Sequence, residues 1–332
     1  MRILHTLHWV QFAGTERVCV DLCNEISKQN EVILLSNKNI ENYISKNVKF
    51  INFDFEKNRR NPFFLYKTAK FIEKIRPDII HCHNTKELEI MRYMQVFLKK
   101  KIPLIATKHV LTPKKKYALA DLCVGILEDT FDIINSKNKI IIKNGMSYKT
   151  PKKLQMDKKF KIIFSGRLVE AKGLGILINA LSAVKFDYIC YIFGDGLDKE
   201  HFVTLVKELK LDEKIKFMGF VDNINDYLFS CDLQIIPSIF EPYGLVAIDG
   251  IYYSPLMIST NTGICEQILP SELKFSATPE NLAHKLDEIH ANYDKFVQIF
   301  APIKAKKDEF SVAKMAQKYI NAYENLIKDF KK

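Results

Sequence analysis

The chain has 332 residues, 47% of them hydrophobic, and a formal net charge of +11. This length exceeds one ordinary domain and suits two domains of roughly 150 residues each. The hydrophobic content supports two sizeable cores and excludes a chain that is disordered throughout. The seven cysteines are odd in number, scattered and without a C-x-x-C pair, which is typical of free thiols in a reducing compartment. Cys19 and Cys23 are one helical turn apart and are interpreted as a buried face of small residues rather than a metal site.

The N-terminal segment has a short apolar run and an early acidic residue, Glu16, which argues against a signal peptide. No stretch approaches the roughly 18 apolar residues that a membrane-spanning helix needs. We therefore expect a cytoplasmic protein that is soluble or attached peripherally to the inner face of the cytoplasmic membrane.

The excess positive charge is confined to the N-terminal half. Residues 1–150 hold 26 Lys and Arg against 15 Asp and Glu, whereas residues 151–332 hold 24 of each. A basic half favours an anionic partner, which could be nucleic acid, a membrane surface or an acidic substrate. The alternative is that lysine-rich composition only keeps the surface solvated, and it stays open at this point.

Short apolar runs alternate with helical patterns through residues 1–146. Strands are predicted over 1–7, 31–37, 48–53, 78–83 and 102–109, helices over 15–29, 62–75 and 85–98, and a closing segment over 140–145. Strands that alternate with helices of 10–15 residues indicate parallel βαβ units and an open, doubly wound sheet.

A polar segment, residues 147–160, carries Pro151 and five lysines and is predicted to be a linker. Beyond it the alternation restarts, with strands over 161–166, 188–194, 215–219, 233–238 and 256–260 and helices through 180–184, over 201–209 and from 244. Residues 306–332 form an amphipathic helix, with Phe310, Met315, Tyr319, Tyr323 and Leu326 on one side. The α/β pattern predicts two Rossmann-like domains that face a cleft, residues 1–146 and 161–305. Ligands of such sheets bind at the carboxyl ends of the strands.

Two cations follow the first strand of the second half, in the segment SGRLVEAKG. The Arg167 guanidinium can donate two parallel hydrogen bonds to a phosphate, and the Lys172 ammonium supplies a compact positive charge. Together they can bind a diphosphate. An ordinary basic surface loop is the simpler interpretation of this segment by itself.

The segment EPYGLVAID forms the second candidate site. The strand over 233–238 delivers Glu241, and Gly244 then begins a helix whose first free amides, near Leu245, offer an anion site. Asp249 lies about two turns up that helix, where a carboxylate can accept from ribose hydroxyls. The alternative is that Glu241 merely caps the helix, which contributes about 0.3–1 kcal/mol without any ligand.

Glycines end two further strands of this half, in segments 192–196 and 217–221. A glycine there lets the backbone approach a base or phosphate, or simply makes a turn. Val221, at the end of the second segment, is a candidate donor contact.

In the N-terminal half, Gly14 lies at the first strand–helix junction, a phosphate-facing position in dinucleotide folds. It is one glycine and not a G-x-G-x-x-G, which argues against NAD. His81 and His83 end a strand, and because side chains alternate along a strand we expect at most one of them, His83, to face the cleft. No further carboxylate or thiolate at metal spacing is evident beside this pair. His109 ends the next strand and is a weaker candidate for the site than His83, because a lone histidine is more often structural.

These motifs resemble those of a known family. S-G-R-L-V-E-A-K-G, I-F-G-D-G, E-P-Y-G-L followed by Asp249, and I-K-N-G-M are similar to the retaining GT-B glycosyltransferases of the large family four, and F-A-G-T-E and D-I-I-H-C-H-N fit its N-terminal half. The resemblance covers nearly the whole chain and is most specific over residues 163–266. The sequence departs from it at Asp249, where the family has Glu, at I-Y-Y-S-P after it, and at Ala13 in place of the first glycine.

The resemblance implies a role for each matching residue. Arg167 and Lys172 would bind the donor diphosphate, and Glu241 would bind donor-sugar hydroxyls beside the amides of Gly244 and Leu245. Residue 249 would bind ribose, Gly14 would lie near the phosphates and His83 near the reacting sugar. The final helix would cross back to the N-terminal domain.

The chain has no D-x-D triplet to hold a divalent metal, the nearest approach being Asp54-Phe55-Glu56. We therefore expect a metal-independent transferase without a cofactor, in which cations and a helix N-terminus stabilise the leaving diphosphate. It would move a hexose or N-acetylhexosamine, most commonly UDP-linked, with retention to a glycan acceptor of the lipid-linked or surface-polysaccharide kind. A leaving-group phosphate oxygen would take the acceptor's proton.

The expected partner of the basic half is an anionic membrane surface. Its cations cluster as Lys99–Lys101, Lys114–Lys116 and Arg59-Arg60, the last beside Phe63, Phe64 and Tyr66. Three other interpretations stay open: a GT-B sugar-nucleotide epimerase, a nucleic-acid-binding protein, which lacks a stacking platform, and an inactive scaffold.

Overall fold

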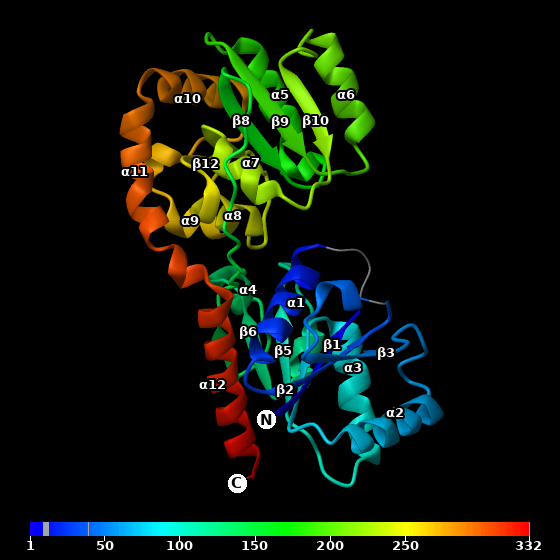
Figure 1. Cartoon of the computed structure of the whole chain (residues 1–332). Coiled ribbons are helices and arrows are strands. Elements are labelled where there is room, and N and C mark those ends of the chain that lie inside the picture. The colour runs from blue at the N-terminus through cyan, green and yellow to red at the C-terminus, as the bar shows by residue number, and fades with distance from the viewer. Residues whose placement is uncertain (9–12, 39, 332) are drawn as a thin grey trace. The chain divides into compact units, whose positions relative to one another are not determined.

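The structure, a computed structural model, describes residues 1–8, 13–38 and 40–331 (Figure 1). It has two compact units: residues 1–147 with the C-terminal stretch from Glu309, and Tyr148–Asp308. Each unit holds one parallel sheet, and the predicted pair of α/β domains is confirmed. Most of the loop predicted before Gly14 lies outside the described residues.

The first unit is built on seven parallel strands in the order β3-β2-β1-β4-β5-β6-β7. They are β1 (Arg2–Leu7), β2 (Glu31–Ser36), β3 (Val48–Asn52), β4 (Ile79–Cys82), β5 (Leu104–Lys108), β6 (Leu122–Gly125) and β7 (Lys139–Ile141). The central strands are buried on both faces, as parallel strands between two helix layers must be. Chain order reverses between β1 and β4, which pair directly with His5 opposite His81.

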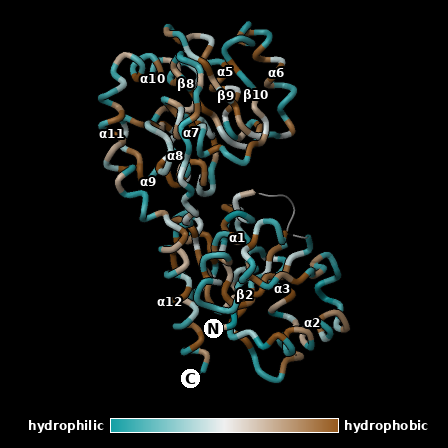
Figure 2. Tube along the Cα trace, in the orientation of Figure 1, coloured by the Kyte–Doolittle hydropathy of each residue, from teal (hydrophilic) through white to brown (hydrophobic). Residues whose placement is uncertain are grey.

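Helices cover both faces of this sheet. They are α1 (Gly14–Ile26), α2 (Pro62–Ile75), α3 (Thr85–Tyr93), α4 (Glu128–Asp132) and α12 (Val312–Lys331). Helices α1 and α12 pack against each other. Four of the five residues predicted for the apolar side are buried in α12, and the fifth, Phe310, is buried in the 3-10 turn before it. In Figure 2 α12 alternates hydrophobic and hydrophilic residues, in keeping with a helix that has one buried face.

The second unit has five parallel strands in the order β10-β9-β8-β11-β12. They are β8 (Phe160–Ser165), β9 (Tyr188–Phe193), β10 (Ile215–Gly219), β11 (Leu233–Ile236) and β12 (Met257–Ser259). Its helices are α5 (Leu174–Ala183), α6 (Lys199–Glu208), α7 (Ile224–Ser230), α8 (Leu245–Tyr253), α9 (Ile264–Ile268), α10 (Pro279–Ala291) and α11 (Tyr293–Ala305). Chain order reverses here between β8 and β11.

Several short or irregular elements differ from the sequence predictions. The helix predicted over 85–98 ends at Tyr93 and continues as a 3-10 turn over Met94–Phe97. The last helix starts at Val312 after a 3-10 turn over Lys307–Phe310. Strand β6 and helices α4, α7, α9, α10 and α11 were not predicted. Four- to seven-residue elements carry too few residues to show a period, and Pro302 interrupts the pattern of α11.

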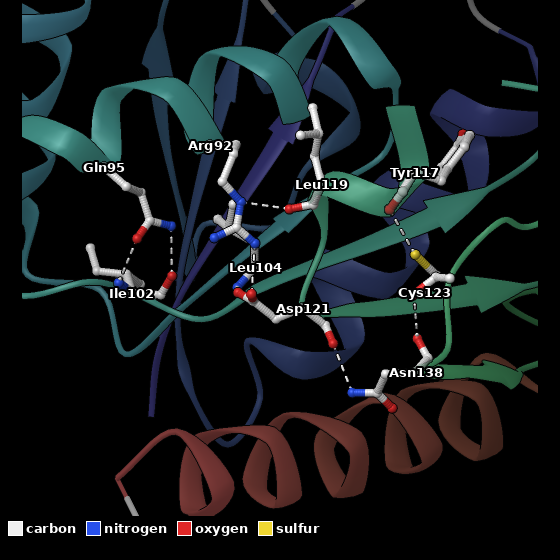
Figure 3. A network of polar contacts seen from close by, with 10 residues as sticks. Arg92, Gln95, Ile102, Leu104, Tyr117, Leu119, Asp121, Cys123 and Asn138 are labelled. Carbon is white, nitrogen blue, oxygen red and sulfur yellow. Dashed lines mark hydrogen bonds and ion pairs between the residues drawn. The ribbon is translucent and has the colours of Figure 1, made fainter. Parts of the chain in front are cut away.

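A polar network joins three strand beginnings of the first unit (Figure 3). Arg92, at the end of α3, donates to Asp121 Oδ1 at 2.6 Å and to the Leu119 carbonyl at 2.6 Å. Asp121 Oδ2 accepts from the Leu104 amide at the start of β5, and its carbonyl accepts from the Asn138 side chain just before β7. One residue, Asp121, thus links the starting points of β5, β6 and β7 through its side chain and its carbonyl, far from the strands' carboxyl ends.

Candidate functional site

The candidate donor residues of the second unit gather where its strand order reverses. Lys172 follows β8 and Glu241 follows β11, and these strands are hydrogen-bonded neighbours in the sheet. In open α/β sheets the loops diverge at such a point and leave a crevice at the carboxyl ends of the strands. Residues that are 69 positions apart in the chain are therefore brought together.

Lys172 is positioned by a turn that only glycine fits. The 3-10 turn Glu170–Lys172 ends at Gly173, which has φ +68° and also begins α5. A Cβ at Gly173 would lie 1.9 Å from the Pro237 carbonyl oxygen just after β11. The Ile239 amide donates to the Ala171 carbonyl at 3.0 Å and fastens the same two loops. This close backbone packing directs Lys172 toward the end of β11.

Lys172 and Glu241 form an ion pair, with Nζ 2.5 Å from Oε1. Their side chains are 15% and 8% exposed. Ser238, itself buried, donates its hydroxyl to the same carboxylate oxygen at 3.0 Å. The Glu241 amide donates to Thr262 Oγ1 at 2.9 Å, which anchors the backbone of this loop. A buried carboxylate held by a cation and a hydroxyl is a rigid, oriented acceptor for further hydrogen bonds.

A helix begins four residues beyond Glu241. Gly244, with φ +87°, precedes α8, whose first residue is Leu245. Gly263 packs so tightly on this turn that a Cβ there would lie 2.5 Å from the Tyr243 carbonyl oxygen. The first amides of a helix have no partner within the helix and carry partial positive charge, so they can bind an anionic group.

Arg167 lies in the loop that follows β8, before the turn that carries Lys172, and it is exposed. Its loop is packed on the neighbouring strand end, because a Cβ at Gly194 would lie 1.9 Å from the Gly166 carbonyl oxygen. Val221 is half-buried between β10 and α7, next to Phe220, which is exposed. Within the part of the chain that the structure describes, neither Arg167 nor Val221 forms a hydrogen bond or ion pair with Lys172 or Glu241.

Asp249 lies closer to the start of its helix than the sequence suggested. Because α8 begins at Leu245, Asp249 is just over one turn into it and not two. Its side chain is almost completely buried.

Sequence reasoning missed two side chains of this site, Ser238 and Thr262. The sequence did contain a signal for them, since both polar residues lie at or just after the end of a predicted strand. Ser238 closes the segment LQIIPS and Thr262 lies just beyond β12. Polar residues that follow parallel strands gather at one edge of the sheet.

The two candidates of the first unit lie at its own point of strand reversal. Gly14 is the exposed first residue of α1, after β1. His83 follows β4 and is buried. Its Nε2 lies 3.2 Å from His5 Nδ1, and its Nδ1 lies 3.2 Å from His109 Nε2. His83 is therefore the middle member of a row of three imidazoles.

The expectation that His81 and His83 lie on opposite faces was wrong. Residues two apart in a strand share a face, and the two rings stack with their centroids 4.2 Å apart. Burial lowers the pKa of His81 and of His83 well below the usual range and lowers the pKa of His109 to about 4. These three rings are uncharged at neutral pH.

The basic residues of the first unit are not all free. Arg59 and Lys116 both pair with the buried carboxylate of Glu89, each at 2.9 Å. Lys99–Lys101 are exposed. On α2, Phe63 and Tyr66 are exposed, with the ammonium groups of Lys67 and Lys70 over their rings. Among the described residues, no helix is both long and apolar enough to cross a membrane.

Two family models match the chain. The model "Glycosyl transferases group 1" matches residues 148–306, and "Glycosyltransferase Family 4" matches residues 12–127. A similar protein is the O-antigen biosynthesis glycosyltransferase WclY of Escherichia coli, 30% identical over 212 residues, or 58% of each chain. Another is the N-acetylgalactosamine-N,N'-diacetylbacillosaminyl-diphospho-undecaprenol 4-alpha-N-acetylgalactosaminyltransferase of Campylobacter jejuni, 31% identical over 44% of this chain and 42% of its own. The chain thus matches about two fifths to three fifths of the length of these curated relatives.

Solved structures share the fold over almost the entire length. HepE of Anabaena, solved with UDP and glucose, has a TM-score of 0.81 at 17% identity and covers 98% of this chain and 100% of its own. The lipopolysaccharide outer core galactosyltransferase WaaB has a TM-score of 0.73 at 16% identity and covers 98% of this chain and 99% of its own. At such identities the likeness shows the fold. Together with the two family models, it places this chain in the GT-B glycosyltransferases.

Proposed function

We propose that the protein transfers a hexose or N-acetylhexosamine from a UDP-sugar to a glycan acceptor, with retention and without a metal ion. The observation that carries the proposal is the Lys172–Glu241 pair, held at the strand reversal of the second unit beside the N-terminus of α8. Such a site offers positive charge for a diphosphate and an oriented carboxylate for a sugar hydroxyl.

Each residue has a distinct role in this proposal. Lys172 and Arg167 bind the diphosphate and stabilise its charge as the glycosidic bond to phosphate breaks, and the amides near Gly244 and Leu245 add donors. Glu241 accepts hydrogen bonds from the donor sugar, and Asp249 from the ribose. The acceptor hydroxyl attacks the anomeric carbon from the face that the phosphate leaves, and a phosphate oxygen takes its proton. His83 is assigned to the reacting sugar, and Gly14 to the phosphates and the acceptor.

The comparisons support the donor and acceptor classes. HepE was solved with UDP-glucose as well as with UDP, and the Campylobacter relative is named for a diphospho-undecaprenol acceptor. We infer a lipid-linked or surface-polysaccharide acceptor of the lipopolysaccharide or O-antigen kind.

A nucleotide panel tests the donor. UDP, GDP, ADP and NAD are added to the protein and the shift in unfolding temperature is measured, since a ligand at about 100 times its Kd adds about 2.7 kcal/mol to stability. UDP should give the largest shift and Lys172→Ala should remove it. A larger shift with GDP would move the donor to a GDP-sugar, and no shift with any nucleotide would contradict the proposal.

The alternative within the same fold is a sugar-nucleotide epimerase. It would consume a UDP-sugar without an acceptor and yield free sugar or an isomer. Product analysis with and without a glycan acceptor separates the two, because a transferase forms a new glycosidic bond whose anomeric configuration also tests retention.

We further propose that the first unit binds an anionic membrane surface reversibly. Its support is the exposed pair Phe63 and Tyr66 beside Lys67 and Lys70, together with Lys99–Lys101. Aromatic rings beside cations suit the lipid headgroup boundary, and each cation near such a surface contributes about 1 kcal/mol.

Co-sedimentation with liposomes tests this surface. Binding should require anionic lipid, fall steeply with salt and weaken when Lys99–Lys101 become Gln. A matched control changes three exposed lysines of the second unit, Lys152, Lys153 and Lys158, to Gln and should bind as the wild type does. Equal binding to neutral and anionic vesicles would refute the membrane proposal and leave the transferase proposal untouched.

A further inference from the structure

A cluster of soft ligand atoms lies in the core of the first unit. His5 on β1 and Cys19 and Cys23 on α1 bring one imidazole nitrogen and two thiol sulfurs to within 4.8 Å of one another. All three residues are 0% exposed. The two cysteines share one face of α1 because they are four residues apart, and α1 packs on β1, which carries His5.

The orientation of His5 leaves one nitrogen available. Its Nδ1 faces His83 Nε2 at 3.2 Å, whereas its buried Nε2 has no hydrogen-bond partner within the described part of the chain. An unpaired buried polar atom costs about 1–3 kcal/mol, so natural cores rarely keep one. Metal-binding histidines show this arrangement, with one ring nitrogen on the ion and the other held by a neighbouring acceptor.

The neighbouring group of three histidines is a weaker candidate. His81 could join His5 and His83 by distance. However, His81 Nδ1 lies 2.7 Å from the Tyr323 hydroxyl, and its Nε2 lies 2.8 Å from Thr107 Oγ1. Both nitrogens of His81 are therefore occupied, which leaves the two thiols as the remaining partners for His5.

We propose that His5 Nε2, Cys19 Sγ and Cys23 Sγ bind a thiophilic cation of the Zn²⁺ and Cu⁺ kind. Thiolate and imidazole are the ligands that these ions prefer. Binding releases the two thiol protons, and two thiolates then balance a divalent charge, which a dry core requires. Zinc bonds of about 2.3 Å to sulfur and about 2.0 Å to nitrogen require the three ligand atoms, which lie within 4.8 Å of one another, to draw closer together on binding.

The site is structural and lies in a different unit from Lys172 and Glu241, so no step at the donor depends on it. It ties β1 to α1, the helix that begins at Gly14. The spacing of Cys19 and Cys23 had favoured a simple buried face, and the ligand set became visible only when the fold placed His5 against it.

Metal content of the intact chain is the first measurement. Protein is produced with added zinc, or in a second preparation with added copper, purified under reducing conditions and analysed by mass spectrometry of its metals. We expect about one ion per chain, lost in Cys19→Ala and Cys23→Ala. Cys82→Ala is the matched control, since Cys82 is equally buried in the same unit and should keep the ion.

Cobalt provides a readout that does not depend on the variants. Wild-type protein unfolded and refolded with Co²⁺ should develop a thiolate-to-cobalt charge-transfer band together with the visible bands of a low-coordinate ion. Copper in place of zinc would support the soft site and assign it to Cu⁺. Absence of zinc, copper and the cobalt band from folded wild type would overturn the proposal, as would an unchanged metal content in a folded Cys19→Ala/Cys23→Ala double variant.

Discussion

Removing Lys172 alone from the Lys172–Glu241 pair should destabilise the second unit more than removing both partners does. The two charges are 2.5 Å apart and mostly shielded from water. At an effective dielectric of about 20, their attraction is about 7 kcal/mol before desolvation is counted. Loss of one partner of a fully buried pair costs about 3–5 kcal/mol because the other charge is left uncompensated.

Three variants measure this effect. Lys172→Met should lower the free energy of unfolding by about 3 kcal/mol, since Glu241 then keeps only the Ser238 hydroxyl. Glu241→Gln should cost about 1–2 kcal/mol, because the amide oxygen still accepts and Lys172 is partly exposed. The double variant leaves neither charge and should cost about 2 kcal/mol, which gives a coupling energy of about 2 kcal/mol.

Urea unfolding combined with hydrogen exchange of the β8 and β11 peptides is the assay, because the two units need not unfold together. The exposed pair Lys159–Asp187, at 3.3 Å, is the matched control and should show a coupling below about 1 kcal/mol. Additive losses at Lys172 and Glu241 would refute the buried-pair argument.

The same variants separate the two proposed roles. Lys172→Ala should weaken UDP binding and lower turnover by about 10²–10³, the usual effect of one lost donor to a developing charge. Glu241→Gln should lower turnover by orders of magnitude yet leave UDP affinity unchanged or higher, because it removes a negative charge beside the diphosphate and frees Lys172. A tenfold loss of UDP affinity in Glu241→Gln, in a folded protein, would show that the carboxylate does not act on the sugar alone.

Three further predictions concern metal, backbone and pH. Turnover should persist in excess EDTA, because Lys172 and the first amides of α8 supply the positive charge; complete loss that manganese restores would contradict a metal-free mechanism. Gly173→Ala should abolish UDP binding and destabilise the second unit, since its Cβ would overlap the Pro237 carbonyl, whereas Gly175→Ala two residues later meets only ordinary contacts and should stabilise α5 by up to about 1 kcal/mol. Burial raises the pKa of Glu87 well above its usual range, so the folded carboxyl stays protonated while the unfolded one ionises above about pH 4.3. Stability should therefore fall as pH rises above that value, and Glu87→Gln should flatten this slope in thermal scans from pH 4 to 8; an unchanged slope would exclude Glu87 as its source.

Local sequence determined the α/β class and most of the elements in each unit. Apolar runs of four to six residues bounded by turn residues mark the parallel strands, because strands buried on both faces need no alternation. The apolar side of α12 was predicted residue by residue, since a long helix repeats its period often enough to be recognised. Arg167, Lys172, Glu241 and Gly244 were singled out because each follows a predicted strand.

Only the tertiary structure decided which of these residues meet. Lys172 pairs with Glu241 because β11 lies beside β8, and strand order is a long-range property that no local pattern encodes. Ser238, by contrast, reaches the carboxylate locally, since it lies three residues before Glu241 in the same loop.

Short elements such as β6 and α7 escaped prediction because packing and not periodicity stabilises them. The histidines were misjudged at the level of geometry, since His81 and His83 share a face. Their surroundings come from β1, β5 and α12, so the fold alone shows that His83 lies between His5 and His109. The contact of His5 with Cys19 and Cys23 was likewise beyond local patterns, because a strand and the helix that covers it meet only when both are packed.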